Sequence, residues 1–351
     1  MEALAFLTEP FFGKPGWAWL LFATIVVALL VFDLGVLHRK AREIPVGESL
    51  LLSAGYIAVA LVFGGWVWWQ LGPQSGIDYF TGYLIEKTLS LDNVFVISLI
   101  FTALAVPRAL QHRVLFYGIL GVVVLRAIVI GFGTSLVNEF EWLLFLFGAF
   151  LIFTGIKMLL SANKAEDMRE SRLLRFLQRR MRLTNGLRGE AFVVREPDAA
   201  GRLRLYGTPL LLALIMVELV DVIFAVDSVP AILAITTDPY IVYTSNIFAI
   251  LGLRALYFAL AATVHRFHYL KYALAIVLVF IGAKIFWNHF YGKIDPAISL
   301  GVTVALLTGG VLYSLWKTRG GGHAEKPGDT ARLQADAAPH GRENVISRGG
   351  R

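Results

Sequence analysis

Long apolar stretches separated by short polar segments dominate the chain. An α-helix needs about 20 apolar residues to cross the hydrocarbon core of a bilayer. Stretches of that length recur from residue 17 to residue 316. The pattern predicts nine spans, at about 17–37, 50–70, 78–104, 113–133, 141–160, 208–236, 242–264, 270–291 and 297–316. We therefore predict an all-α integral membrane protein with about nine transmembrane helices.

Two of these spans carry carboxylates near their middle. Glu86 and Asp92 lie in the third span, and Glu218, Asp221 and Asp227 lie in the sixth. Each carboxylate at the centre of a membrane helix costs about 2.5–3.5 kcal/mol on insertion scales. We interpret the five acids as a functional site that binds a cation, shares protons or lines water. Structural ion pairing is the alternative, with five intramembrane bases available: Lys87, Arg126, Lys157, Arg254 and Lys284.

Composition and charge support a membrane protein and exclude several other classes. Hydrophobic residues make up 57% of the 351 residues, and there is no cysteine. Disulfides, thiolate metal sites and thiol redox chemistry within this chain are therefore excluded. The formal charge is +7. Because the basic residues cluster between apolar spans and accompany no base-reading module, we expect no nucleic-acid binding.

The distribution of basic residues also predicts the orientation of the chain. Twenty-five Lys and Arg residues fall in one set of connections, namely 38–42, 107–113, 161–207, 265–271 and the tail from residue 316. The opposite set contains only Lys14 and Lys293. Basic connections face the cytoplasm, so we expect the N-terminus outside and the C-terminus in the cytoplasm.

An internal repeat relates the two acidic spans. The segment Glu86-KTLSL-Asp92-Asn93 matches Asp221-VIFAV-Asp227-Ser228, and Lys157 in FLIFTGIKML matches Lys284 in VLVFIGAKIF. Spans 3–5 and 6–8 would thus form two units that enter the membrane from opposite sides. This is an inverted-topology repeat, an arrangement of transporters in which the binding site lies near the midplane between the halves.

The repeat divides the chain into six parts. These are 1–77 (an N-terminal extension and two transmembrane helices), 78–160 (the first three-helix repeat), 161–207 (a cytoplasmic basic loop), 208–291 (the second repeat), 292–319 (the last transmembrane helix) and 320–351 (a disordered cytoplasmic tail). The start of the loop has the spacing of a basic amphipathic helix, which would lie either on the anionic inner leaflet or in solvent.

Helix geometry limits how the acids can converge. Glu218 and Asp221 share a helix face, but six residues separate Asp221 from Asp227, about 240° around an ideal helix. We therefore predict local unwinding around Asp227 and Pro230, which would also free carbonyl oxygens as ligands. Neither cluster contains His or Cys, so zinc and copper are disfavoured. Hard-oxygen ligands leave magnesium, calcium and manganese open.

Several further residues are candidates for ligands or for gating. Ser90, Asn93 and Ser228 lie within the acidic clusters. Arg126 and Arg254 suit structural pairing or gating, whereas Lys157 is near enough to the cytoplasmic face to extend its amine there. Asp33 is interpreted as a polar residue at the end of the first span, with a vestibule ligand as the alternative. The remaining candidates are Asn246 and Lys284.

These residues occur in strings that resemble the TerC family. IEKTLSLDNVFVISLIF, DLGVLHRK and the block from MVELVDVIFAVDSVP to NIFAILGLRALYF carry the resemblance, which extends over residues 17–316 and is closest to the Alx-like bacterial inner-membrane branch. It implies manganese(II) efflux and a fold related to LysE-type transporters. It places the transport residues at the five acids, with Asn93, Ser228 and Asn246 at matching polar positions.

The combined expectation is a secondary transporter. It would export a divalent cation, manganese(II) first and calcium or magnesium otherwise, in exchange for protons. The alternative is an accessory or scaffold protein that acts in metal or stress response, of the tellurium-resistance type, without transport. We expect no enzymatic activity, because the sequence has no nucleophile–base motif or phosphate loop. We also expect no resident cofactor. The expected partners are the metal ion, protons and the lipid bilayer, and the sequence identifies no protein partner.

Overall fold

The structure is a computed structural model that describes residues 9–35, 45–160, 172–197, 201–260 and 269–319. Its elements in chain order are β1 (Pro10–Phe11), β2 (Lys14–Pro15), α2 (Gly16–Gly35), α3 (Val46–Leu71), α4 (Pro73–Ala103), α5 (Arg108–Glu139), α6 (Leu143–Leu160), α7 (Arg172–Arg180), β3 (Val193–Pro197), β4 (Leu203–Gly207), α8 (Pro209–Leu233), α9 (Pro239–Leu251), α10 (Leu253–Leu260), α11 (Leu270–Phe290) and α12 (Pro296–Arg319).

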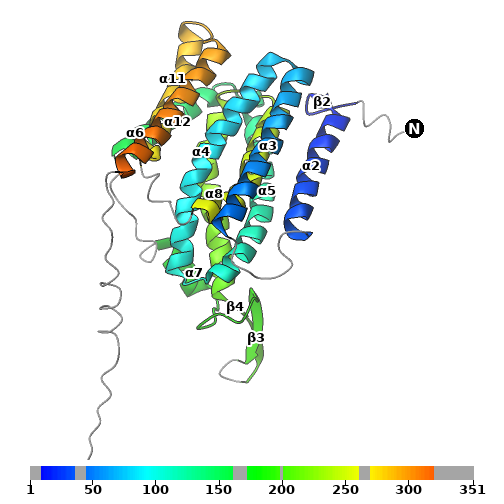
Figure 1. The fold of residues 1–351 in the computed structure, drawn as a ribbon, viewed down its shortest axis with the longest axis vertical. Coiled ribbons are helices and arrows are strands. Elements are labelled where there is room, and N and C mark those ends of the chain that lie inside the picture. The colour runs from blue at the N-terminus through cyan, green and yellow to red at the C-terminus, as the bar shows by residue number, and fades with distance from the viewer. Residues whose placement is uncertain (1–8, 36–44, 161–171, 198–200, 261–268, 320–351) are drawn as a thin grey trace, which may run out of the picture.

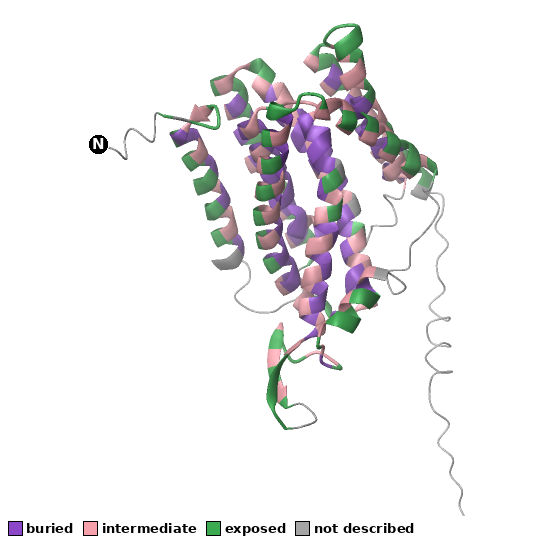
Figure 2. Cartoon of the chain, turned by 180° about the vertical axis from the view of Figure 1, so that it is seen from behind, coloured by how far each residue is buried: buried purple, intermediate pink, exposed green. Residues whose placement is uncertain are grey.

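The long helices form one bundle (Figure 1). At its centre α4 packs against α8 and α9, and α5 packs against α8. Buried residues concentrate inside the bundle, and exposed ones cover its outer faces (Figure 2). Large apolar side chains such as Val31, Leu51 and Val62 are among the exposed ones. Such a surface is costly in water but suits contact with lipid, so the chain is an all-α integral membrane protein.

The number of spans is close to the predicted nine. In the described part of the chain, eight helices are long and apolar enough to cross a membrane, with α9 and α10 counted as one. The predicted span that is not among these eight is the third, 78–104, which corresponds to α4. Its 31 residues extend roughly 46 Å. Its acidic and basic residues exclude it from the apolar class, although it lies within the bundle (Figure 1).

The predicted unwinding near Pro230 is wrong. Helix α8 runs without interruption from Pro209 to Leu233, with Pro230 inside it. Proline removes one backbone hydrogen bond, here the one to the carbonyl oxygen of Val226, and the loss of one bond does not break a helix that packs against α4 and α5 along its length. The interruption occurs instead at Gly252, which separates α9 from α10 within the span predicted as continuous.

Helices α6 and α11 approach each other through glycines in a reciprocal way. A methyl group at Gly155 would lie 2.7 Å from the carbonyl oxygen of Ala275 and from Val279. One at Gly282 would lie 2.6 Å from the carbonyl oxygen of Gly148 and 2.8 Å from Ile152. Ala275 and Val279 lie seven and three residues before Gly282. Gly148 and Ile152 lie seven and three residues before Gly155. Such exchange of equivalent positions is typical of a two-fold relationship, which agrees with the proposed inverted repeat.

The segment between α6 and α8 contains one predicted element, a helix, and one that was not predicted, a β-hairpin. The predicted amphipathic helix is present as α7, and β3 and β4 form an antiparallel hairpin that projects from the end of the bundle (Figure 1). Phe192 just before β3 contacts the ring of Tyr117 on α5. The alternating pattern on both sides of Asp198–Gly201 was the available signal for a hairpin. Residues 161–171 and the predicted disordered tail, 320–351, lie outside the described residues.

A candidate cation site around Arg126

Arg126 of α5 occupies the centre of a buried polar network between four helices. Only 1% of its surface is exposed. Its Nε and Nη2 donate to the two carboxylate oxygens of Asp221 on α8, at 3.0 and 2.9 Å. Its Nη1 donates to Oε1 of Glu86 on α4. A buried guanidinium is stable only when its charge and its N–H groups are matched, and the two carboxylates supply that match.

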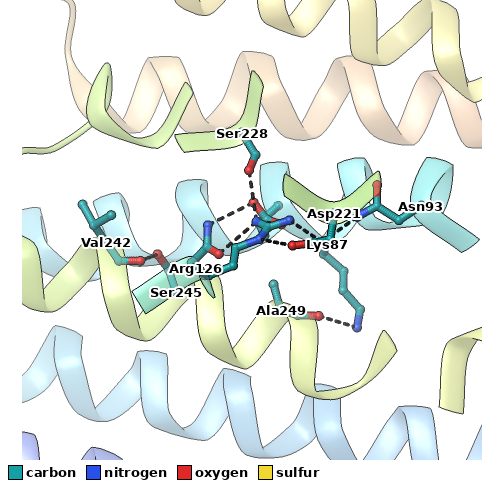
Figure 3. A network of polar contacts seen from close by, with 10 residues as sticks. Lys87, Asn93, Arg126, Asp221, Ser228, Val242, Ser245 and Ala249 are labelled. Atoms are coloured by element: carbon teal, nitrogen blue, oxygen red, sulfur yellow. Dashed lines mark hydrogen bonds and ion pairs between the residues drawn. The ribbon is translucent and has the colours of Figure 1, made fainter. Parts of the chain in front are cut away.

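Neutral oxygens complete the surroundings of the guanidinium. Nη1 of Arg126 lies 3.0 Å from the hydroxyl of Ser228 and 3.1 Å from Oδ1 of Asn246. The amide nitrogen of Asn246 donates to Oε2 of Glu86 at 3.0 Å. Figure 3 shows Asp221 and Ser228 directed at Arg126 from α8. The network therefore draws carboxylate, hydroxyl and amide oxygens from α4, α8 and α9 to one position.

The structure brings together only part of the predicted acidic set. Glu86 and Asp221 meet at Arg126, whereas the side chains of Asp92 and Asp227 lie outside the described part of the structure, and their roles as ligands remain predictions. Among the described residues, no three His, Asp or Glu side chains are grouped to hold a metal ion. Pairing between acids and an intramembrane base, the alternative to a functional site, is therefore present at the centre of this network.

Three oxygens of candidate residues are buried without a hydrogen-bond partner: Oγ of Ser90, Oδ1 of Asn93 and Oε2 of Glu218. Asn93 uses its amide nitrogen to donate to Oδ1 of Asp221 at 3.4 Å. Glu218 lies against α5 at Gly121, where a methyl group would be 2.1 Å from Oε1. Unpartnered buried oxygens cost free energy unless a proton, a water molecule or a cation satisfies them.

A small cavity adjoins this network. It is bordered by Asn93, Asp221 and Arg254, together with apolar side chains of α5 and α8, and its volume is about 20 Å³, enough for about one water molecule. The lining residues of α5 and α8 come from the first half of each helix, whereas Arg126 lies deeper. The cavity thus lies between the network and the end of the bundle where α5 and α8 begin, which the charge distribution predicts to be cytoplasmic.

Lys87 supports the interruption between α9 and α10. Its Nζ donates to the backbone carbonyl oxygen of Ala249 at 3.1 Å, in the last turn of α9 (Figure 3). Carbonyl groups at a helix C-terminus lack intrahelical partners and carry partial negative charge, so a cation is favourable there. From the sequence, Lys87 is expected only as an ion-pair partner, because no local pattern predicts that a helix is interrupted at Gly252.

The other charged candidates lie elsewhere. Asp33 on α2 and Arg254 on α10 form a buried ion pair, with 5% and 3% of their surfaces exposed. Lys284 donates to the hydroxyl of Ser299 at 3.0 Å. Lys157 is exposed on α6, which is compatible with an amine that reaches the membrane surface.

The fold and the network define a multi-pass α-helical membrane protein with a charged polar centre. Comparison with known proteins identifies one family for this chain. The Integral membrane protein TerC family matches residues 71–321, and the chain belongs to this family. No solved structure matches it.

Similar proteins match over nearly their whole lengths. An uncharacterised membrane protein of Myxococcus xanthus is 48% identical over 89% of this chain and 96% of its own. One from Rickettsia felis is 47% identical over 85% and 97%. The putative membrane-bound redox modulator Alx of Escherichia coli strain K12 is 45% identical over 86% of this chain and 97% of its own length.

Proposed function

We propose that this protein exports a divalent metal cation, manganese(II) in the first place, across the bacterial inner membrane in exchange for protons. The observation that carries the proposal is the convergence of Glu86 and Asp221 on one buried position between four helices. Intramembrane acids that converge in this way are typical of ion and proton pathways. We propose no enzymatic role.

The donor atoms favour a hard cation. Glu86, Asp221, Ser228 and Asn246 offer only oxygen at the shared position. Manganese, magnesium and calcium prefer such ligands, whereas zinc and copper favour imidazole and thiolate. We put manganese first among the three because of the resemblance to the TerC family.

Proton exchange is included for an energetic reason. Moving one charge against a membrane potential costs about 2.3 kcal/mol per 100 mV, and a divalent ion therefore costs about 4.6 kcal/mol. Without a second ion, an inside-negative membrane would drive the metal inward. Carboxylates such as Glu218, which has a buried oxygen without a partner, are suited to carry protons in return.

Transport would proceed by alternating exposure of the site to the two sides of the membrane. The equivalent spans of the proposed repeat, α4 and α8, supply Glu86 and Asp221, and the reciprocal contact of α6 and α11 supports a two-fold relationship. The cytoplasmic side would be the one that the cavity faces. The N-terminus would lie outside and the C-terminus in the cytoplasm.

Flux measurements test the proposal. In everted vesicles with an imposed pH gradient, acidic inside, we expect manganese(II) uptake that is lost in Glu86→Gln, Asp221→Asn and Asp92→Asn. Glu141→Gln, at an exposed residue between α5 and α6, serves as the control and should keep the flux. Uptake that survives in all three acidic variants would show that the site is wrongly assigned.

A second candidate is an accessory protein without transport. It is favoured by the description of the Alx relatives as putative membrane-bound redox modulators. This chain has no cysteine, so a redox effect would have to act through a partner or a metal. Removing 325–351 and shortening 161–207 separates the two candidates: an exporter keeps its metal flux, whereas an accessory protein that binds partners through these segments loses its phenotype.

A further inference from the structure

The atoms around Arg126 resemble the ligand shell of a divalent cation more than the surroundings of a purely structural arginine. Three acceptors, on Glu86, Ser228 and Asn246, share the single nitrogen Nη1. A carboxylate, a hydroxyl and an amide oxygen directed at one point form the kind of set that binds calcium, magnesium or manganese. Arg126 brings a guanidinium nitrogen to that point from α5.

Arg126 by itself does not neutralise the two carboxylates that it contacts. Glu86 and Asp221 together contribute two negative charges, and Arg126 contributes one positive charge. Lys87 interacts electrostatically with Glu86, but its ammonium group bonds to a backbone carbonyl oxygen. Buried charge that is not neutralised is expensive, and a divalent cation would supply both charges at the carboxylates themselves.

A small cavity adjoins the network on one side. It reaches Asp221 and Asn93, and Oδ1 of Asn93 has no hydrogen-bond partner among the described residues although Asn93 is only 3% exposed. An ion that arrives through this cavity would meet an available oxygen next to a carboxylate that Arg126 holds. Displacement of the guanidinium would then free the remaining oxygens.

We propose that Arg126 is a tethered competitor of the transported cation: its guanidinium occupies the cation position in the empty transporter and leaves when the divalent ion binds. This inference rests on the proposed function. It gives Arg126 a direct role in coupling, because the metal-free site can return across the membrane only if its two carboxylates remain paired. Arg126 supplies that pairing, while the exchanged protons travel on other carboxylates such as Glu218.

Equilibrium binding provides the first test. Manganese(II) is titrated into the purified full-length chain in detergent and followed by electron paramagnetic resonance. When a bound state must first be vacated, the apparent affinity falls in proportion to the vacant fraction. If Arg126 is displaced in about a tenth of molecules or fewer, Arg126→Gln should bind manganese(II) about tenfold or more tightly than wild type.

Arg113→Gln is the matched control. Arg113 also lies on α5 and is paired with a carboxylate, Glu190, but it is near the start of the helix and is not among the residues that line the cavity. Its substitution should leave the manganese(II) affinity within about twofold of wild type. Arg126→Lys, which keeps the charge but loses the two-pronged contact with Asp221, should give an intermediate affinity and serves as the test variant if Arg126→Gln does not fold.

Transport provides a readout that a structural role would not move. In liposomes, Arg126→Gln should keep manganese-for-manganese exchange, in which the site always returns with metal, and lose net proton-driven flux, in which it returns without metal. Equal affinity in wild type and both Arg126 variants, or loss of exchange together with net flux in folded protein, would overturn the tethered competitor. Absence of flux in the wild type for every divalent cation would instead refute the proposed function.

Discussion

Lys87 of α4 and Ala249 of α9 are joined by a hydrogen bond of 3.1 Å between the ammonium group and the backbone carbonyl oxygen. The contact holds α4 against the end of α9, three residues before the helix is interrupted at Gly252. It therefore stabilises an irregular backbone segment beside the Arg126 network, where membrane proteins tolerate such segments only if their polar groups are satisfied.

Replacing this lysine should destabilise the protein. Lys87→Met removes the donor and leaves the carbonyl group buried without its partner, at an expected cost of about 1.5–3 kcal/mol for a charged hydrogen bond. Thermal unfolding in detergent, followed by tryptophan fluorescence, measures the change. Lys157→Met, at an exposed lysine on α6, should shift the midpoint little, and an equal shift in both variants would contradict the assigned contact.

The ion pair between Asp33 and Arg254 should behave as a buried pair. Asp33→Ala leaves a buried guanidinium without its partner, for which we expect a loss of about 3–5 kcal/mol, whereas the double change Asp33→Leu with Arg254→Met should cost much less. Lys14→Met, which breaks the more exposed pair with Asp238, should cost about 0–1 kcal/mol. Additive losses in the double variant would show that the two residues do not interact.

Gly121 should accept a methyl group only if Glu218 moves. Gly121→Ala would place a methyl group against the carboxylate of Glu218, and because this is the end of a flexible side chain we expect it to turn aside, at a cost of about 0.5–1.5 kcal/mol. The double variant Gly121→Ala with Glu218→Ala should recover most of it, as a double-mutant cycle of thermal stabilities would reveal. Gly65→Ala, at a position on α3 with nothing within 4 Å, should be neutral or slightly stabilising, by about 0.5–1 kcal/mol.

Metal selectivity should follow the oxygen ligands. In liposomes that contain the purified protein, unlabelled manganese(II) should inhibit labelled manganese(II) flux most strongly, and calcium or magnesium more weakly. Zinc should be a poor competitor, because the Arg126 network has no imidazole or thiolate ligand. Stronger inhibition by zinc than by manganese would exclude the hard-oxygen site.

The membrane-spanning helices could be predicted from the sequence because each needs an apolar run of about 20 residues to cross a bilayer, and such runs are directly visible. The sequence identified Glu86 and Asp221 as members of one site through their matched spacing. It did not predict which base would pair with them, since Arg126 is 40 residues from Glu86 and 95 from Asp221 along the chain. Convergence of that kind depends on helix packing rather than on local pattern.

The interrupted helix shows a different limit. Pro230 was the stronger local signal, yet α8 remains continuous because its packing against α4 and α5 outweighs the one hydrogen bond that proline removes. Gly252 is compatible with a regular helix by composition, and the interruption there accompanies the tertiary contact of Lys87 with Ala249. The hairpin of β3 and β4, by contrast, had a recognisable alternating pattern and could have been predicted.

The glycine contact between α6 and α11 has a consequence for motion. Backbone carbonyl oxygens and the side chains of Ile152 and Val279 fill the space beside the two glycines, so this close packing resists sliding and leaves rotation about the crossing as the easier motion. Each proposed half supplies one of them, and equivalent residues meet there. When two halves related by a two-fold axis exchange conformations, points on the axis stay in place. In the proposed exchange between the two halves, the crossing of Gly155 and Gly282 would therefore stay fixed while the other helices rotate about it.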